Sequence, residues 1–597
     1  MATPPAAALR ALRAQALDER ALYFEHDPST PASPRTERAL LVRLHHASTR
    51  PAASAPPRVA SSLSAFLHTP LQPADDADDA PRLAAWLARH WPPAPAPQIS
   101  LQRFPATGRG LSSSASLAAG EAALAVPLRL LLTPERAVEL PGMERALHAA
   151  AAALGAPVDA DVRLALALLG QPRLEPRGAW GEYLPLLPAE PPNALMWQAA
   201  PVGQLAGTPL PAQVGALRRE LRQLWTALVP HLCGGPHAPL PPHAFRWRRF
   251  LWAYAIVESR GVVLDGLSTA RTTALVPVAD MCNHTVRAQL AHPRLEGEPP
   301  HRALVLRCLS AVPAGAELQL YYGRLPCLHT LQFYGFVEAE LLPFEAVRID
   351  LELPDEEDDP PGGEEGAETA SDVAARRRRV LSDLGLGLSH FLRDTGGVPS
   401  KLLASLRVCM LSDAELREVE ARGATPSRDA FPFAPLNTEN EASALHALTM
   451  ILEAQVEAMV GGAAQQIAQE WEEEDAAWAA EDAAAEQAAA GAPLQEAHAQ
   501  PAPDQIAWPE ISPEDQAAQR NAINEAVASM RAFYLRCYTG ALVHANSLMG
   551  ELSALTDQQG LSESAPNGDG SPDEHAHHAE DTESYEDEHA AQKQRMS

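Results

Sequence analysis

The sequence predicts an α+β protein in which a β-rich domain is followed by an all-α domain. Strand–turn–strand patterns occur at 108–126 and 302–323, where apolar residues alternate with polar ones on either side of a turn, and each predicts a β-hairpin. Beyond residue 371, apolar residues instead recur every three or four positions, which is the spacing of amphipathic helices. An acidic stretch separates these two regions, so we expect two domains joined by a linker.

The charge distribution supports this division. The chain has 597 residues and a formal net charge of −29, and nearly all of the excess lies in 355–368, 461–510 and 557–597. Runs of this composition are typical of solvated, disordered segments. The rest of the chain is nearly neutral, so it lacks the basic face that nucleic-acid binding requires. We therefore expect no nucleic-acid partner.

These observations predict five regions. Residues 1–80 form a mostly disordered extension, 81–350 the β-rich domain with a helical insert, and 351–371 an acidic linker. Residues 372–553 form the helical domain, and 554–597 a disordered acidic tail. An Ala/Glu-rich insertion at 461–515 interrupts the helical domain and is expected to be solvated.

Individual elements can be assigned within these regions. A helix is expected at 81–91, and 141–260 alternates helices with Pro-rich loops. In the second domain we expect helices at 372–386 and 399–410. Two more helices are expected to begin at caps, and a last apolar stripe follows the insertion: the capping box Ser412 to Glu415, the cap Asn437, and the stripe Ile523, Val527, Met530, Phe533 and Cys537.

Cysteine usage and hydropathy bear on the compartment. Six cysteines are scattered without a C-x-x-C pair, which fits a reducing compartment and indicates neither disulfides nor a zinc cluster. No apolar run approaches the roughly 18 residues of a membrane span. The N-terminus is Ala- and Arg-rich like a transit peptide but carries Asp18, Glu19, Glu25 and Asp27. We expect a cytoplasmic or nuclear protein, with chloroplast import left open.

Polar residues that follow an apolar run mark the candidate site. In LVPVADMCNHT, which begins at Leu275, a buried-strand pattern ends in Asp280, Asn283 and His284, and buried polar groups need partners. Arg260 lies upstream, and the strand ending in Tyr321 and Tyr322 lies downstream.

Taken together, these motifs resemble the SET-domain protein methyltransferases, in particular the family of the Rubisco large-subunit lysine methyltransferase and the actin-histidine methyltransferase. The matching motifs occur in family order: GRGL with AGE, AWGEYLPLLP with Leu205, Gly207 and Thr208, WAYAIVESR, LVPVADMCNH, AGAELQLYYG and FYGF. The helical region is similar to that family's C-terminal substrate-binding domain through ARRRRVLSDLGL, VPSKLLASLRVCMLSDAEL and APLNTENEASAL.

The resemblance implies a pseudoknotted β fold that binds S-adenosylmethionine on one face and admits the target side chain from the other. It implies that Arg260 meets the methionine carboxylate of this cofactor. It also implies that Tyr322 is the catalytic tyrosine that orients the attacking nitrogen. The further residues it implies are, for the cofactor, Glu121, Ala122, Asp280, Asn283, His284, Tyr334, Gly335 and Phe336, and for the substrate channel, Tyr321, Tyr334 and Ala279.

The target residue is left open. Ala279 is similar to the lysine-modifying branch, whereas DMCNHT is similar to the histidine-modifying branch. A lysine nitrogen is the first choice and a histidine nitrogen the alternative, with a protein substrate docked by the helical domain and a monomeric enzyme. Cys327 stands where the family has an asparagine, so a non-catalytic interaction module is the alternative of another class.

Plainer interpretations accompany these assignments. His284 alone is more simply a hydrogen-bonded core histidine, and Tyr322 a packing aromatic at a strand end. No ligand-type residue stands at metal-binding spacing from His284, so no metal is expected. The run Arg376 to Arg379 is read as a solvated helix face rather than a nuclear-localisation patch.

Overall fold

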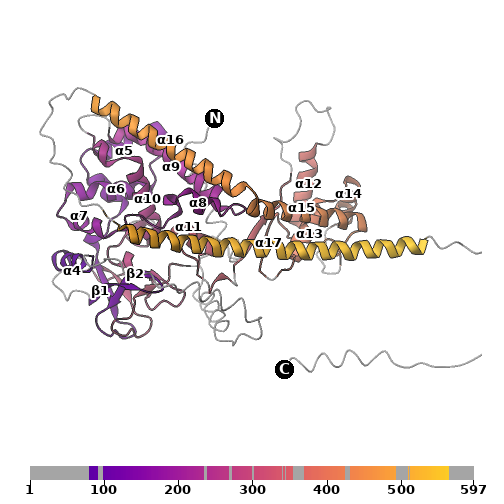
Figure 1. Cartoon of the computed structure of the whole chain (residues 1–597), viewed down its shortest axis with the longest axis horizontal. Helices are drawn as coiled ribbons and strands as arrows, with labels where there is room; N and C mark the ends of the chain where they lie inside the picture. Colours follow the sequence, from indigo (N-terminus) through magenta and orange to yellow (C-terminus); the bar gives the residue numbers. More distant parts are fainter. Residues whose placement is uncertain are drawn as a thin grey trace, which may run out of the picture. The chain divides into compact units, whose positions relative to one another are not determined.

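This computed structural model describes residues 79–563 apart from gaps at 92–97, 234–237, 268–271, 299–301, 324, 339, 343–344, 354–368, 395, 424–429, 492–508 and 510. The predicted N-terminal extension, nearly all of the acidic linker and most of the acidic tail lie outside the described residues. The described residues up to Asn546 form one compact unit, and those from Ser547 belong to a second (Figure 1).

The strands in the described part of the chain form five small sheets, one of which includes a strand from the second part. β1 (Ile99–Phe104) pairs with β2 (Gly108–Ser113), and β3 (Ala122–Pro127) pairs with β8 (Ala303–Arg307). β7 (Arg294–Glu296) completes that second sheet. The remaining pairs are β4 (Gly261–Leu264) with β5 (Thr272–Leu275), β6 (Asn283–His284) with β9 (Gln319–Leu320), and β10 (Val347–Asp350) with β11 (Ser389–Leu392).

The two expected hairpins do not form, and this part of the prediction is wrong. β2 does not pair with β3, nor β8 with β9; the two segments pair with each other instead. An antiparallel register runs through the bridges Ser112–Glu317 and Leu117–Val312 and continues into the pairing of Ala122 with Arg307. Each connection is longer than a tight two-residue turn, so local geometry does not force either hairpin to close.

Helices inserted between β3 and β4 cover this β structure. The long members of this helical insert are α5 (Met143–Leu154), α6 (Ala160–Leu174), α9 (Leu210–Leu232) and α10 (Trp247–Arg260). Short helices α7 (Ala179–Tyr183) and α8 (Ala199–Gly203) join them, and α4 (Asp79–His90) precedes β1. The apolar residues of α10 are buried on several sides, because α6, α9 and β5 all pack against it.

The second part is helical, as expected. Its first helices are α12 (Ala370–Asp383), α13 (Ser400–Cys409), α14 (Asp413–Arg422) and α15 (Thr438–Val460). The capping box of Ser412 with Glu415 and the Asn437 cap are both present. These local signals identified helix starts because each cap is satisfied within its own turn.

The acidic insertion is the second difference from expectation. Residues Ala463–Gly491 form α16, a 29-residue helix, where a solvated insertion was predicted. Arg218 of α9 forms an ion pair with Asp475, and Arg222 reaches Glu481 at 2.7 Å and Asp482 at 3.0 Å. The acids of this segment are therefore partly neutralised by arginines far away in sequence.

Tryptophans also contribute to the contact between α9 and α16. The Arg218 guanidinium lies 4.1 Å from the ring centroid of Trp471, and that of Arg222 lies 5.8 Å from Trp478. Trp478 also packs edge-on against Trp247, with ring centroids 5.5 Å apart. The acidic composition of 461–510 hid this apolar face from sequence analysis, because the acids there outnumber Trp471 and Trp478.

Helix α17 (Pro513–Glu563) carries the predicted last stripe. Its five residues, Ile523, Val527, Met530, Phe533 and Cys537, are all buried. The Tyr538 hydroxyl donates to the Gly207 carbonyl at 3.3 Å. Gly207 has φ +79°, and an added Cβ would collide with Met459, so glycine is required at this close approach.

The arginine run at 376–379 lies partly against the fold. Arg376 pairs with Glu420 in α14, Arg377 donates to the Leu411 carbonyl, and Arg378 donates to the Leu353 carbonyl. The run therefore lies on a helix, as predicted, but it is not simply a solvated face, because three of its arginines contact the rest of the chain.

Candidate functional site

Strands β6 and β9 bring the two polar motifs together. They pair in parallel, with Asn283 opposite Gln319 and His284 opposite Leu320. Tyr321 and Tyr322 follow β9 directly, so they lie beside the Asn-His pair although 38 positions separate His284 from Tyr322.

His284 is held from both ring nitrogens. Its Nδ1 accepts a hydrogen bond from the Tyr322 backbone N–H at 3.1 Å, and its Nε2 lies 3.1 Å from the Glu338 carboxylate. A ring that accepts at Nδ1 carries its proton at Nε2, facing Glu338. The imidazole is stacked against Tyr321 and Phe336, each with ring centroids 5.7 Å away. His284 is therefore a positioning group in an aromatic cluster.

Tyr322 lies at the centre of that cluster. Its hydroxyl donates to the Cys282 carbonyl at 2.7 Å, and its ring centroid is 5.0 Å from His284 and 4.9 Å from Tyr334. Burial, reinforced by the neighbouring Tyr334, raises the pKa of Tyr322 above its ordinary value. The phenol is therefore neutral at physiological pH.

The Asn283 side chain joins the site to β2. Its amide donates to the Arg109 carbonyl at 3.0 Å and to Glu317 at 2.8 Å. A Cβ at Gly110 would lie 2.7 Å from both the Asn283 amide nitrogen and the Glu317 carboxylate. Only glycine lets β2 approach this closely.

Asp280 anchors the other side. Arg260 donates to its carbonyl at 2.6 Å, and the Tyr183 hydroxyl donates to its carboxylate at 2.5 Å. Burial raises the pKa of Asp280, while the Arg260 guanidinium opposes that shift. Burial and the Asp280 charge raise the pKa of Tyr183 well above its ordinary value. The phenol therefore stays a donor.

The same tyrosine supports a strained turn. Val278 has φ +74° and ψ −50°, a conformation that is rare for a β-branched residue. Its N–H donates to the Tyr183 oxygen at 2.7 Å. The next residue, buried Ala279, begins the short turn that carries Asp280.

Helix α11 (Cys327–Tyr334) presents the remaining predicted residues. Tyr334 ends the helix, Gly335 turns the chain with φ +71°, and Phe336 follows. The Tyr334 and Phe336 ring centroids are 6.0 Å apart. At the other end, the Cys327 N–H donates to the buried carboxylate of Glu345.

Two predicted residues lie elsewhere. Glu121 bonds the Ala118 N–H within its own turn, and Ala122 pairs with Arg307 in the β3–β8 sheet. Among the described residues neither is hydrogen-bonded to the Asn-His pair, whereas Asn283 bonds the Arg109 carbonyl.

Sequence analysis missed several residues of this network. Tyr183 and Glu317 each hydrogen-bond a predicted site residue, the Glu338 carboxylate lies 3.1 Å from His284, and Gly110 allows the close approach of β2. Tyr183 and Glu317 stand inside the quoted motifs AWGEYLPLLP and AGAELQLYYG, and Glu338 stands two residues after FYGF. Motif membership was therefore the available signal.

Among the described residues, no group of histidines, cysteines and carboxylates is placed to hold a metal ion. No helix in the described part combines the length and apolar character of a membrane span.

The fold is that of the SET-domain structures. A solved structure described as the SET domain of LSMT bound to lysine and AdoHcy superposes with a TM-score of 0.53 at 15% identity, covering 83% of this chain and 98% of that chain. No family model matches the sequence.

Curated relatives include one named for its SET domain and one named as a protein methyltransferase. SET domain-containing protein 4 of Mus musculus is 28% identical over 247 residues, which are 39% of this chain and 53% of the relative. Actin-histidine N-methyltransferase of Homo sapiens is 25% identical over 337 residues, which are 54% of this chain and 51% of the relative. The chain spans about half the length of these relatives. Together with the fold, they confirm the predicted resemblance to the SET-domain methyltransferases.

Proposed function

We propose that this protein is an S-adenosylmethionine-dependent protein methyltransferase that acts on a lysine side-chain nitrogen. The observation that carries the proposal is the Asn283–His284 pair packed directly against the Tyr322 phenol. The solved neighbour was determined with lysine and AdoHcy, and the relatives include protein methyltransferases.

The residues present fit the cofactor. The Arg260 side chain is 19% exposed although one of its nitrogens holds Asp280, so it keeps donors for a carboxylate. The cofactor supplies an electrophilic methyl group, whose bond to sulfur breaks as its bond to nitrogen forms. The β6 backbone and the 108–110 segment would border it. We therefore add 108–110 to the proposed border, for which Glu121 and Ala122 remain predicted members.

The chain's own contribution is alignment. His284 fixes the Tyr322 backbone, and the Cys282 carbonyl fixes the Tyr322 hydroxyl, so the phenol has a defined direction. A well-aligned nucleophile gains roughly 7–11 kcal/mol over free encounter. The rings of Tyr322, Tyr334 and Phe336 form apolar surroundings that favour an uncharged lysine nitrogen.

Cofactor titration and methyl transfer test the proposal together. We expect calorimetric binding of S-adenosylmethionine, and methyl transfer to a protein substrate that falls by at least about a hundredfold in Tyr322→Phe while cofactor affinity is kept. Tyr538→Phe, which removes a hydroxyl bonded to Gly207, is the matched control. Absence of cofactor binding at millimolar concentration would refute the proposal.

A histidine target is the second candidate. The actin-histidine relatives and the DMCNHT motif favour it. Tandem mass spectrometry of the methylated substrate decides between the two, because it assigns the methyl group to lysine or to histidine. Cofactor binding with no transfer to any protein would instead favour the non-catalytic alternative.

A further inference from the structure

Two neighbouring cavities lie where the helical insert meets α16 and α17. Their volumes are about 200 and 280 Å³, and they share Met196, Trp197, Gln198 and Arg248. The first also reaches Arg520 and Ile523 of α17, and the second reaches Arg218 of α9. We call the residues around these two cavities the insert groove.

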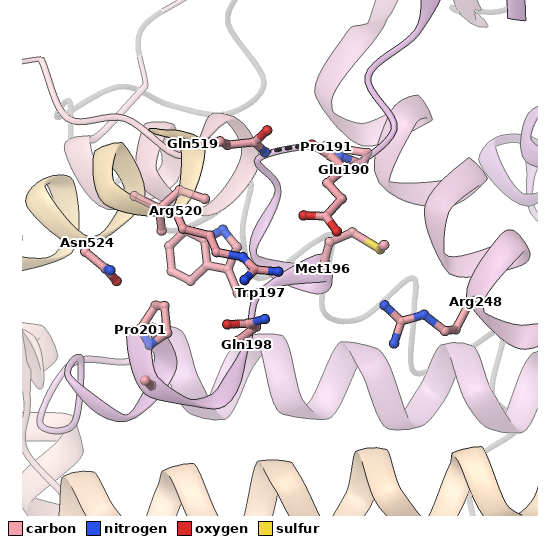
Figure 2. A pocket seen from close by; sticks show the side chains of 12 residues that line it. Glu190, Pro191, Met196, Trp197, Gln198, Pro201, Arg248, Gln519, Arg520 and Asn524 are labelled. Carbon is pink, nitrogen blue, oxygen red and sulfur yellow. Dashed lines mark hydrogen bonds between the residues drawn. The ribbon is translucent and has the colours of Figure 1, made fainter. Parts of the chain in front are cut away.

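The acids of the insert groove have partners within the chain, whereas two of its arginines form no ion pair with the described residues. Its acids are satisfied within the chain: Glu190 accepts from Gln516, Asp475 pairs with Arg218, and Asp482 pairs with Arg222. Arg248 and Arg520 form no ion pair with any residue that the structure describes. Figure 2 shows both side chains extending toward the strip formed by Met196, Trp197 and Gln198. The groove therefore offers unneutralised positive charge, although the whole chain is strongly acidic.

Arg218 adds a buried donor at the far end. Its side chain is only 4% exposed, and its Nε and Nη1 find no hydrogen-bond partner among the described atoms. Buried donors without partners are energetically unfavourable. Because Arg218 lines the larger cavity, an acceptor bound there would satisfy it.

The other end of the groove adjoins the candidate site. Ile523, which lines the smaller cavity, lies 3.4 Å from where a Cβ of Gly335 would stand, and Pro192 packs against the same point. Gly335 separates Tyr334 from Phe336, the two rings assigned to the channel wall. A chain lying in the groove would therefore run up to that wall.

We propose that the insert groove binds an acidic, extended segment of the substrate protein. Its carboxylates would meet Arg520, Arg248 and the free edge of Arg218, and its apolar side chains would contact Met196 and Trp197. The role of the insert groove as a substrate site rests on the proposed methyl transfer. Binding of an acidic segment to the groove does not depend on that proposal. Charge complementarity selects this occupant, because arginines without partners recognise carboxylates.

Fluorescence anisotropy on the full-length chain tests the binding, with the cofactor omitted. The probe is a short fluorescein-labelled peptide in which Glu alternates with Leu. We expect saturable binding that weakens with added salt, and at least about a tenfold loss of affinity in Arg248→Glu/Arg520→Glu. Both positions are exposed, so the fold should survive, as thermal denaturation can verify. Arg145→Glu, at another exposed arginine on α5, should bind like the wild type.

Three outcomes would overturn the proposal. They are no binding, equal binding by the double variant, and equal binding of a peptide with Gln in place of Glu. Binding that requires deletion of 557–597 would assign the groove to the chain's own acidic tail instead. Tyr322→Phe should bind the peptide normally, so a failed methyltransferase assay and a failed docking assay give separate answers.

Discussion

At the scale of single residues, the Tyr183 hydroxyl supports the site by satisfying two buried groups. It donates to Asp280 and accepts from the N–H of Val278, whose backbone is strained. Residues held in such conformations persist only where their surroundings fix them. Tyr183 thus acts on the site through the turn that carries Asp280.

Tyr183→Phe should lower the free energy of unfolding by about 2–4 kcal/mol, because it leaves the Val278 N–H and one Asp280 oxygen without partners. Urea denaturation measures the change. Tyr538→Phe removes a hydroxyl with a single bond of 3.3 Å and should have an effect of about 1 kcal/mol or less. Equal losses in the two variants would contradict the role assigned to Tyr183.

Glu338 should act on the reaction through His284. Glu338→Gln keeps the shape but removes the negative charge that lies 3.1 Å from Nε2, so the imidazole beside Tyr322 is held less firmly. We expect reduced turnover, with little change in substrate KM. Steady-state kinetics checks this, with Glu340→Gln, at a surface pair with Arg287, as the control.

At the scale of elements, α11 is anchored by a carboxyl group that titrates near neutrality. Glu345 is 4% exposed and accepts from the N–H of Cys327 at the helix start. Burial raises its pKa from 4.5 to about 7, although the two backbone donors oppose the shift. Since α11 carries Tyr334, this group links pH to the aromatic cluster.

The folded state holds the Glu345 proton more tightly than the unfolded state, so stability falls as pH rises from about 4.5 to about 7. The decrease should reach up to about 3 kcal/mol and level off above pH 7. Glu345→Gln should remove this part of the pH dependence in denaturant titrations at several pH values. A slope unchanged by the substitution would contradict the assignment.

Helix α16 depends on tryptophans that the acidic composition conceals. Trp471 is 4% exposed, stacks on Arg218 and donates to the Trp197 carbonyl at 3.3 Å. Trp471→Ala should release α16, with a local loss of about 3–5 kcal/mol. Hydrogen exchange over 463–484 should rise in this variant and stay unchanged in Glu472→Ala, which lies on the exposed face.

Features that depend on neighbouring residues could be predicted from the sequence, whereas features that depend on distant partners could not. Ser412, Asn437 and the α17 stripe were predicted correctly, because caps and helical periodicity depend on neighbours within a few residues. The hairpins were predicted wrongly, and α16 was missed, because strand exchange and the Arg–Trp contacts depend on partners far along the chain. His284 and Tyr322 were found through motifs. Tyr183 stands inside one of those motifs but was not singled out, and Glu338 lies just outside FYGF, where no local pattern identified it.

At the scale of the whole molecule, the end of the chain is separable from the site. The residues from Ser547 belong to a unit of their own. A chain ending at Asn546 should keep its melting temperature within about 2 °C and its methyl transfer. Differential scanning fluorimetry and the transfer assay measure both. A large loss of either would show that the second unit supports the first.

The exchange of strand partners has a consequence for synthesis. Thr107 and Glu317 bond across 210 positions, and the whole helical insert lies between them. Closing so large a loop is entropically unfavourable and slow. During synthesis on the ribosome, β2 and β3 remain partly unpaired until their partners, which extend to residues near 320, have emerged. A nascent chain paused before that point would have its helices but not the paired strands β6 and β9 of the candidate site, so we expect chaperones to bind it.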